Sequence, residues 1–188
     1  MRNFRLILVC AVLLSIFATM SFAQDSKSEA KPNKNIKLKY NQSKNETTVT
    51  LKTLSLSNSM NKEFTRDSEY GLMDLDVSFT YLGKEITKPA GAMTLKFKST
   101  AKTLLWQHAQ RLVAVIDDLD ALMLGDTKYS SNSQTFYMEE ILTISVPYAA
   151  AQKIANAKTL SFQLGTRSIG IKNDQLEDLR AMINRMTP

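Results

Sequence analysis

The sequence predicts an α+β fold that is rich in β-strands, mostly antiparallel, with two helices near the C-terminus. The chain of 188 residues is 44% hydrophobic and 22% charged, which is ordinary for one globular domain and rules out a wholly disordered chain. Apolar and polar residues alternate in many short segments before Pro147, and helical spacing appears only after it. Counting the strand-like segments gives about nine short strands. A β-sandwich with peripheral helices is the alternative architecture.

Residues 1–23 have the pattern of an export signal. Two arginines supply positive charge, residues 6–17 form an apolar core, and Ser21 and Ala23 place small side chains at the −3 and −1 positions. This order predicts cleavage between Ala23 and Gln24, and therefore export to the periplasm or the medium of a bacterium. An uncleaved membrane anchor is the alternative, but the apolar stretch is shorter than the roughly 20 residues that a spanning helix needs.

Cysteine and charge usage narrow the possible functions of the exported chain. Cys10 is the only cysteine and lies in the leader, so neither a disulfide nor a thiolate nucleophile or metal ligand is expected after cleavage. Residues 24–35 are rich in lysine and nearly without apolar side chains, which predicts a disordered linker before a single domain over residues 36–188.

The excess positive charge lies in that linker region, because residues 46–188 carry 16 basic and 16 acidic side chains. A balanced body and an export signal argue against a nucleic-acid partner. The lysine-rich linker could still make weak contact with an anionic surface through Lys27, Lys31 and Lys34.

Strands are expected over the following segments: 36–40, 47–56, 73–81, 85–87, 93–98, 112–116, 134–146, 160–164 and 168–171. A change of apolar phase inside the second of them indicates a β-bulge, and a polar loop should follow over residues 57–69. Gly83-Lys84 and Gly125-Asp126 suit tight turns, and residues 131–133 suit another. The run at 112–116 is apolar throughout, which is typical of a strand covered on both faces.

Two helices should close the domain. The first follows Pro147, which is favourable in a first turn, with Ser145 as a possible cap. The second is expected to begin with a capping box formed by Asp174 and Glu177. One apolar stripe at helical spacing, made of Leu176, Leu179, Ile183 and Met186, should pack on the sheet.

The sequence contains no catalytic motif, so the candidate site residues are isolated groups. His108 is the only histidine, which excludes a zinc site built from several imidazoles; it is a possible general base or a structural side chain near a turn. Asp117, Asp118 and Asp120 form the densest acidic cluster. They could supply oxygen ligands for Ca²⁺, but the EF-hand pattern is absent, and turn-forming, solvated aspartates are the alternative. No metal and no cofactor are predicted.

Glu140 is the one charged residue in an otherwise apolar alternation over residues 136–146. If that face lies in the core, its carboxylate must be hydrogen-bonded, protonated or paired with an arginine such as Arg111 or Arg167. Both functional sites and structural ion pairs have this property.

These observations favour an exported, non-enzymatic binding or envelope-associated module of unknown partner. A hydrolase that uses carboxylates or a metal is the first alternative, and a carrier of a small apolar ligand is the second. Convergence of the candidate acids in one hollow would favour the hydrolase, and a large apolar cavity would favour the carrier.

Overall fold

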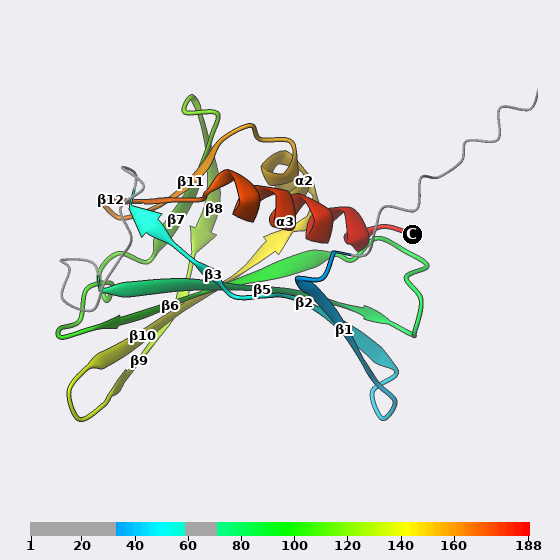
Figure 1. Ribbon diagram of the computed structural model, residues 1–188, viewed down its shortest axis with the longest axis horizontal. Helices are drawn as coiled ribbons and strands as arrows, with labels where there is room; N and C mark the ends of the chain where they lie inside the picture. The colour runs from blue at the N-terminus through cyan, green and yellow to red at the C-terminus, as the bar shows by residue number, and fades with distance from the viewer. Residues whose placement is uncertain (1–32, 59–70) are drawn as a thin grey trace, which may run out of the picture. The chain divides into compact units, whose positions relative to one another are not determined.

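The computed structural model describes residues 33–58 and 71–188, which form two antiparallel β-sheets and two α-helices (Figure 1). The strands are β1 (Ile36–Asn41), β2 (Glu46–Leu51), β3 (Leu54–Ser55), β4 (Ser57–Asn58), β5 (Leu72–Leu82), β6 (Ala92–Ala101), β7 (Arg111–Ile116), β8 (Asp120–Asp126), β9 (Lys128–Ser133), β10 (Met138–Pro147), β11 (Leu160–Leu164) and β12 (Arg167–Gly170). The helices are α2 (Tyr148–Ala155) and α3 (Asn173–Ile183), and a short 3₁₀ turn (Asn184–Met186) follows α3. The predicted class, a strand-rich α+β fold with antiparallel sheets and two helices near the C-terminus, is confirmed.

The seven-stranded sheet has the order β1-β2-β5-β6-β10-β9, with β3 also paired to β5, and the five-stranded sheet has the order β4-β12-β11-β7-β8. Alternation explains how the first sheet forms. In β5, β6 and β10, Leu75, Phe97 and Leu142 lie in one cross-strand row and are fully buried. One residue along each strand, the side chains point to the opposite, polar face of the sheet.

The polar face of the seven-stranded sheet is stabilised by charge pairing. Lys98 Nζ lies 2.9 Å from Asp76 Oδ2, and the Thr53 hydroxyl donates to Asp76 at 2.6 Å. Partial burial disfavours the ionised Asp76, but the hydrogen bonds from Thr53 and Lys98 and the charges of Lys98 and Lys96 outweigh it. They hold the pKa of this carboxyl below its usual value.

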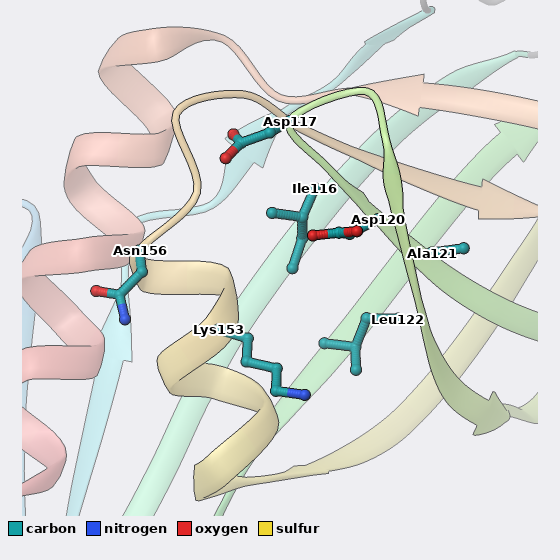
Figure 2. A pocket seen from close by; sticks show the side chains of 7 residues that line it. All are labelled: Ile116, Asp117, Asp120, Ala121, Leu122, Lys153 and Asn156. Atoms are coloured by element: carbon teal, nitrogen blue, oxygen red, sulfur yellow. The ribbon is translucent and has the colours of Figure 1, made fainter.

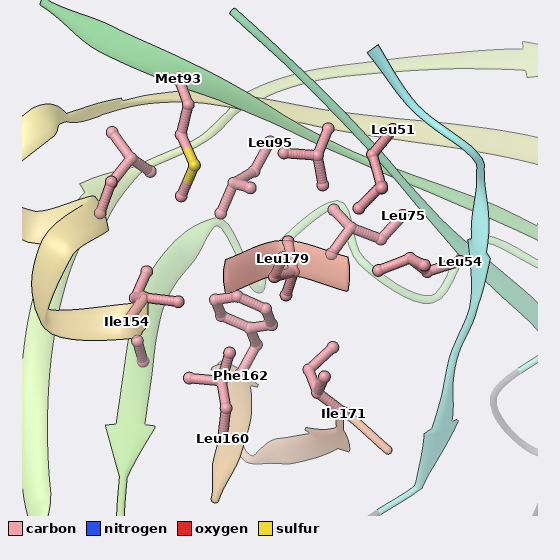
Figure 3. Close-up of a cluster of buried hydrophobic side chains, with 14 of the residues drawn as sticks. Leu51, Leu54, Leu75, Met93, Leu95, Ile154, Leu160, Phe162, Ile171 and Leu179 are labelled. Atoms are coloured by element: carbon pink, nitrogen blue, oxygen red, sulfur yellow. The ribbon is translucent and has the colours of Figure 1, made fainter. Parts of the chain in front are cut away.

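The core lies between the seven-stranded sheet on one side and α3 with the five-stranded sheet on the other (Figure 3). Leu179 of α3 and Phe162 of β11 sit at its centre, and both are fully buried. The Phe97 and Phe162 rings meet edge to face, with centroids 5.3 Å apart. Side chains therefore fill the space between sheet and helix.

The predicted apolar stripe of the second helix is correct: its members Leu176, Leu179, Ile183 and Met186 are all buried. The two helices, however, begin differently from the prediction. The capping box is wrong, because α3 begins at Asn173 and the backbone N–H of Lys172 donates to the side chain of Gln175 at 3.0 Å. Pro147 directly precedes α2, and no side chain caps that helix.

Several strand and turn predictions need correction. No strand forms over residues 85–87. The expected bulge in 47–56, by contrast, is present: β2 pairs Thr50 with Ser78 of β5 and β3 pairs Leu54 with Leu75, so one extra residue lies on the β2–β3 side, while the Lys52 N–H continues the β1–β2 ladder by donating to the Asn35 carbonyl. The expected loop after Leu56 begins with β4, which pairs with β12, and residues 59–69 of that loop lie outside the described residues. The described part of the chain contains twelve strands rather than about nine.

The strand β7 is covered on one face only, contrary to the prediction from its apolar run. Leu112, Ala114 and Ile116 are buried, whereas Val113 and Val115 remain half-buried on the outer face. Gly125-Asp126 is not a hairpin turn either. Both residues belong to β8, which pairs with β7, and the chain crosses to the other sheet within one residue to start β9.

Residues expected in the linker also belong to the folded body. Asn33 and Asn35 donate through their side-chain amides to the two carboxylate oxygens of Asp178, each at 2.8 Å. These bonds fasten the start of β1 to α3. The predicted leader and its cleavage site at Ala23 and Gln24 lie outside the described residues, as does the linker up to residue 32.

Candidate functional site

Glu140, the acidic residue in the apolar alternation, lies on the core face of β10 and has 0% of its surface exposed. Its Oε2 accepts the backbone N–H of Leu105 at 2.8 Å. Its Oε1 accepts the backbone N–H of Trp106 at 2.8 Å and the hydroxyl of Tyr129 at 3.0 Å. The carboxylate is thus satisfied by three donors, two of them main-chain.

These bonds explain why an acid occupies a core position. Residues 102–110 connect β6 of one sheet to β7 of the other without strand structure, so their N–H groups have no sheet ladder to join. Glu140 accepts from two of them and so anchors the connection, while the Trp106 side chain is fully buried beside it. Glu140 therefore has a structural role. Its carboxylate has no solvent-accessible surface that a reactant could reach.

The arginines considered as partners of Glu140 make other contacts. Arg111 lies 3.4 Å from Asp126, and both side chains are largely exposed. The Arg167 guanidinium lies over the Trp106 ring, 5.0 Å from its centroid, which is a cation–π geometry. Tyr129 is the partner that the sequence did not reveal. Burial and the neighbouring Glu140 carboxylate raise the pKa of its hydroxyl above the ordinary value, although a hydrogen bond with Ser131 opposes the shift.

Two other polar groups near Glu140 are buried. Ser99 faces Glu140 across the β6–β10 ladder, and its hydroxyl has no hydrogen-bond partner within the described residues. The indole N–H of Trp106 likewise has none there. Such groups cost stability when they are left unbonded, so the surroundings of Glu140 contain polar atoms that the core does not satisfy within the described residues.

Asp117 and Asp118 form the turn between β7 and β8 together with Leu119, since Ile116 and Asp120 close the ladder. Both aspartates have positive φ, 53° and 58°, a conformation that Asp and Asn tolerate better than most residues. Asp117 Oδ1 accepts the backbone N–H groups of Lys158 at 2.6 Å and of Thr159 at 2.9 Å. These backbone bonds lower the pKa of Asp117 and tie the turn to the connection between α2 and β11.

A surface hollow of about 500 Å³ separates this hairpin from α2 (Figure 2). Ile116 and Leu122 form its apolar wall, Asp120 points into it, and Lys153 extends toward it from α2. Asp117 also lines the hollow, but its Oδ1 is engaged by the backbone. Within the described residues, Asp118 and Asp120 have no ion-pair partner.

A second hollow of about 330 Å³ lies further along β8. Leu124, Asp126 and Ile144 belong to its lining. Because Leu122 borders the first hollow and Leu124 the second, the two follow each other along one strand. We call this region the β8 slot. It is defined by Asp120, Leu122, Leu124 and Asp126 of β8 with Ile144 of β10 and Lys153 of α2.

The remaining candidates are dispersed. His108 is exposed in the connection that Glu140 anchors, and it makes no hydrogen bond within the described residues. Lys34 is exposed, whereas Lys27 and Lys31 lie outside the described residues. The structure therefore brings together Asp117 and Asp120 with Lys153, and it keeps Glu140 and His108 away from that hollow. Sequence reasoning missed the β8 slot, because it assigned the hairpin turn to Gly125-Asp126.

Searches for other functional features are negative for the part of the chain that the structure describes. No group of three or more His, Cys, Asp or Glu side chains there is arranged to hold a metal ion. No helix there has both the length and the apolar character needed to span a bilayer. Comparison of the chain with protein-family models, curated proteins and solved structures finds no match. The arrangement of the described residues is therefore the basis for a proposal about function.

Proposed function

We propose that this chain is an exported, non-enzymatic binding module that contacts its partner along β8, through the apolar outer surface around Met123 and the β8 slot beside it. The observation that carries the proposal is the open apolar surface around β8. Met123 is 57% exposed in the middle of the strand, and Leu119 projects from the turn at its start. On the outer face, Val113 and Val115 of β7 continue this apolar patch. Contiguous exposed apolar surface of this kind marks interaction sites.

The candidate acids support binding rather than catalysis. Glu140 uses both oxygens to hold a connection, and Asp117 holds a turn, so neither is positioned toward a common reactant. A carboxylate-dependent hydrolase remains the alternative at Asp120, the acid that points into the hollow. A carrier of an apolar ligand is less favoured, because side chains fill the core between sheet and helix.

Site-specific photo-crosslinking in the producing bacterium tests the proposal. A photoreactive amino acid replaces Met123 in one variant and Leu38 in the other. Leu38 is the matched control, because it is 54% exposed and also lies on an edge strand, β1. We expect a discrete adduct from position 123 and none from position 38. The partner identified in that adduct is then purified and titrated against the wild-type protein and Met123→Lys.

The proposal predicts that Met123→Lys weakens this binding at least about tenfold, since a charge enters the apolar patch, and that Leu38→Lys leaves it unchanged. Equal adducts at both positions, or none at either, would contradict it. A hydrolytic activity of the purified protein that Asp120→Asn abolishes would favour the hydrolase instead.

A further inference from the structure

We infer that the β8 slot takes an extended polypeptide segment of the partner, which adds to the five-stranded sheet as a strand beside β8 and carries a basic residue next to Asp118 and Asp120. This inference rests on the proposed function, because it specifies the mode and chemistry of binding at the same surface.

The edge strands of the two sheets, which are β1, β9, β4 and β8 within the described residues, differ in how open they are to pairing with another chain. The edge of β1 carries the exposed Lys37 and Lys39, and β9 ends in the exposed polar run 130–133. Charges and polar residues of this kind discourage pairing with another chain, and β4 has only two residues. β8 differs, because its centre, residues 121–124, is an unbroken run of Ala, Leu, Met and Leu. It is the most apolar of these edges, and its one irregularity is a bulge at Leu124, where the register with β7 shifts by one residue.

The surface beside that edge is hollowed along the strand. The two hollows lie in sequence along β8, whose seven residues extend over roughly 23 Å at the usual rise of a strand. At the far end of the slot the Ile144 side chain closes on β8, since a Cβ at Gly125 would lie 3.9 Å from its Cδ1. An added segment would therefore pair with the edge of β8 along residues 120–124, where no strand lies beside it among the described residues, which is the geometry of β-augmentation.

The charges at the two ends of β8 differ in whether they are paired. Asp126 is already paired with Arg111, whereas Asp118 and Asp120 at the other end of β8 have no ion-pair partner within the described residues. Lys153 extends toward the hollow without forming an ion pair with Asp120, so a basic side chain of the incoming segment would supply the missing partner at the start of β8. Self-pairing is disfavoured, because two antiparallel β8 strands centred on Met123 would place Asp120 of each copy opposite Asp126 of the other.

The two faces of β8 specify the rest of the segment. Leu122 lies on the slot side, and Ala121 and Met123 lie on the outer side next to Val115 and Val113. A strand added here would place alternate residues against each of these apolar surfaces. The expected segment is therefore basic at one end and rich in β-branched or apolar residues along the remainder.

Three synthetic peptides titrated into the isotope-labelled full chain test this inference by amide NMR. The first is acetyl-RKVTVTV-amide, the second replaces both basic residues with Glu, and the third has alternate backbone nitrogens methylated so that one edge cannot donate. We expect the basic peptide to shift the amide signals of residues 120–126 and slow their hydrogen exchange. The acidic peptide should bind about tenfold more weakly, which corresponds to a single favourable charge contact. The methylated peptide should not bind.

The protein variants supply the controls. Met123→Lys should abolish the shifts of the basic peptide, and Leu38→Lys should leave them unchanged. Equal binding of the basic and acidic peptides, unaltered binding of the methylated peptide, or a dimer that pairs through β8 would each overturn the inference. If crosslinking at position 123 yields a specific partner while no peptide affects β8, strand addition is wrong and the binding module stands. If neither experiment gives a signal, both proposals fail.

Discussion

The hydrogen bonds of Glu140 predict a specific loss of stability for the substitution Glu140→Gln. The two side chains have the same shape, so the change replaces one acceptor oxygen with an NH₂ donor. If the remaining oxygen takes the place of Oε1, it still accepts from Trp106 and Tyr129. The new NH₂ group then faces the N–H of Leu105, 2.8 Å from the former Oε2, and two donors meet.

The expected loss follows from that geometry. One charge-assisted hydrogen bond disappears, and a partly buried backbone donor is left without an acceptor, which together cost about 2–3 kcal/mol of unfolding free energy. Tyr129→Phe removes only one of three donors and should cost about 1 kcal/mol. The two changes should be non-additive in the double variant, because both act on the same carboxylate.

Urea unfolding followed by tryptophan fluorescence measures this effect directly. Trp106 is the only tryptophan, is fully buried, and belongs to the connection that Glu140 anchors. Far-UV circular dichroism of the same samples distinguishes local opening of this connection from global unfolding. Glu139→Gln is the matched control, since Glu139 is the adjacent residue on the opposite face of β10. If Glu140→Gln and Glu139→Gln both unfold within about 0.5 kcal/mol of the wild type, the anchoring role is refuted.

Three further predictions concern other parts of the chain. Ser99→Ala removes a buried hydroxyl that has no partner among the described residues, so thermal melting should show equal or greater stability, by up to about 1 kcal/mol; a clear loss would reveal a partner. Asp117 has a pKa below 3.8 in the folded protein, so its contribution to stability is present above about pH 4 and is lost as the pH falls through the folded pKa. Asp117→Asn should therefore reduce the fall in urea midpoint between about pH 5 and pH 3, and an unchanged pH dependence would contradict this. Ala23→Phe should block removal of the leader, so that mass spectrometry of the cell envelope finds the uncleaved chain instead of one beginning at Gln24; normal cleavage would show that this site is wrong.

The fold class was predictable because alternation is a local property. The alternation around Leu75 and Phe97 requires one buried face, and the stripe with Leu179 requires another, whichever way the elements are arranged. The predictions that failed concern segments whose local structure is decided by pairing with a strand far away in the sequence. Gly125-Asp126 has good turn chemistry, yet both residues extend β8, because their strand partners Leu112 and Arg111 continue the ladder past them.

The site was predictable only in part, for a related reason. An acid among apolar neighbours indicated that Glu140 needed partners, but the donors at Leu105 and Trp106 are main-chain groups 35 and 34 residues away. No side-chain pattern marks them. Residue chemistry left hydrogen bonding, protonation and pairing with an arginine open for Glu140, and of the arginines considered Arg111 lies at the surface beside Asp126.

By itself, the order of residues determined the strand-rich class, the two closing helices and the buried stripe of the second helix, because each depends on spacing within a few residues of one segment. It also determined that residue 140 would need hydrogen-bond donors once its face was covered. The tertiary structure alone decided that β7 has an open outer face, that β8 ends its sheet, and that hollows lie beside it. These properties depend on which strands become neighbours, and that choice minimises the exposed apolar surface of the whole domain rather than of any one segment.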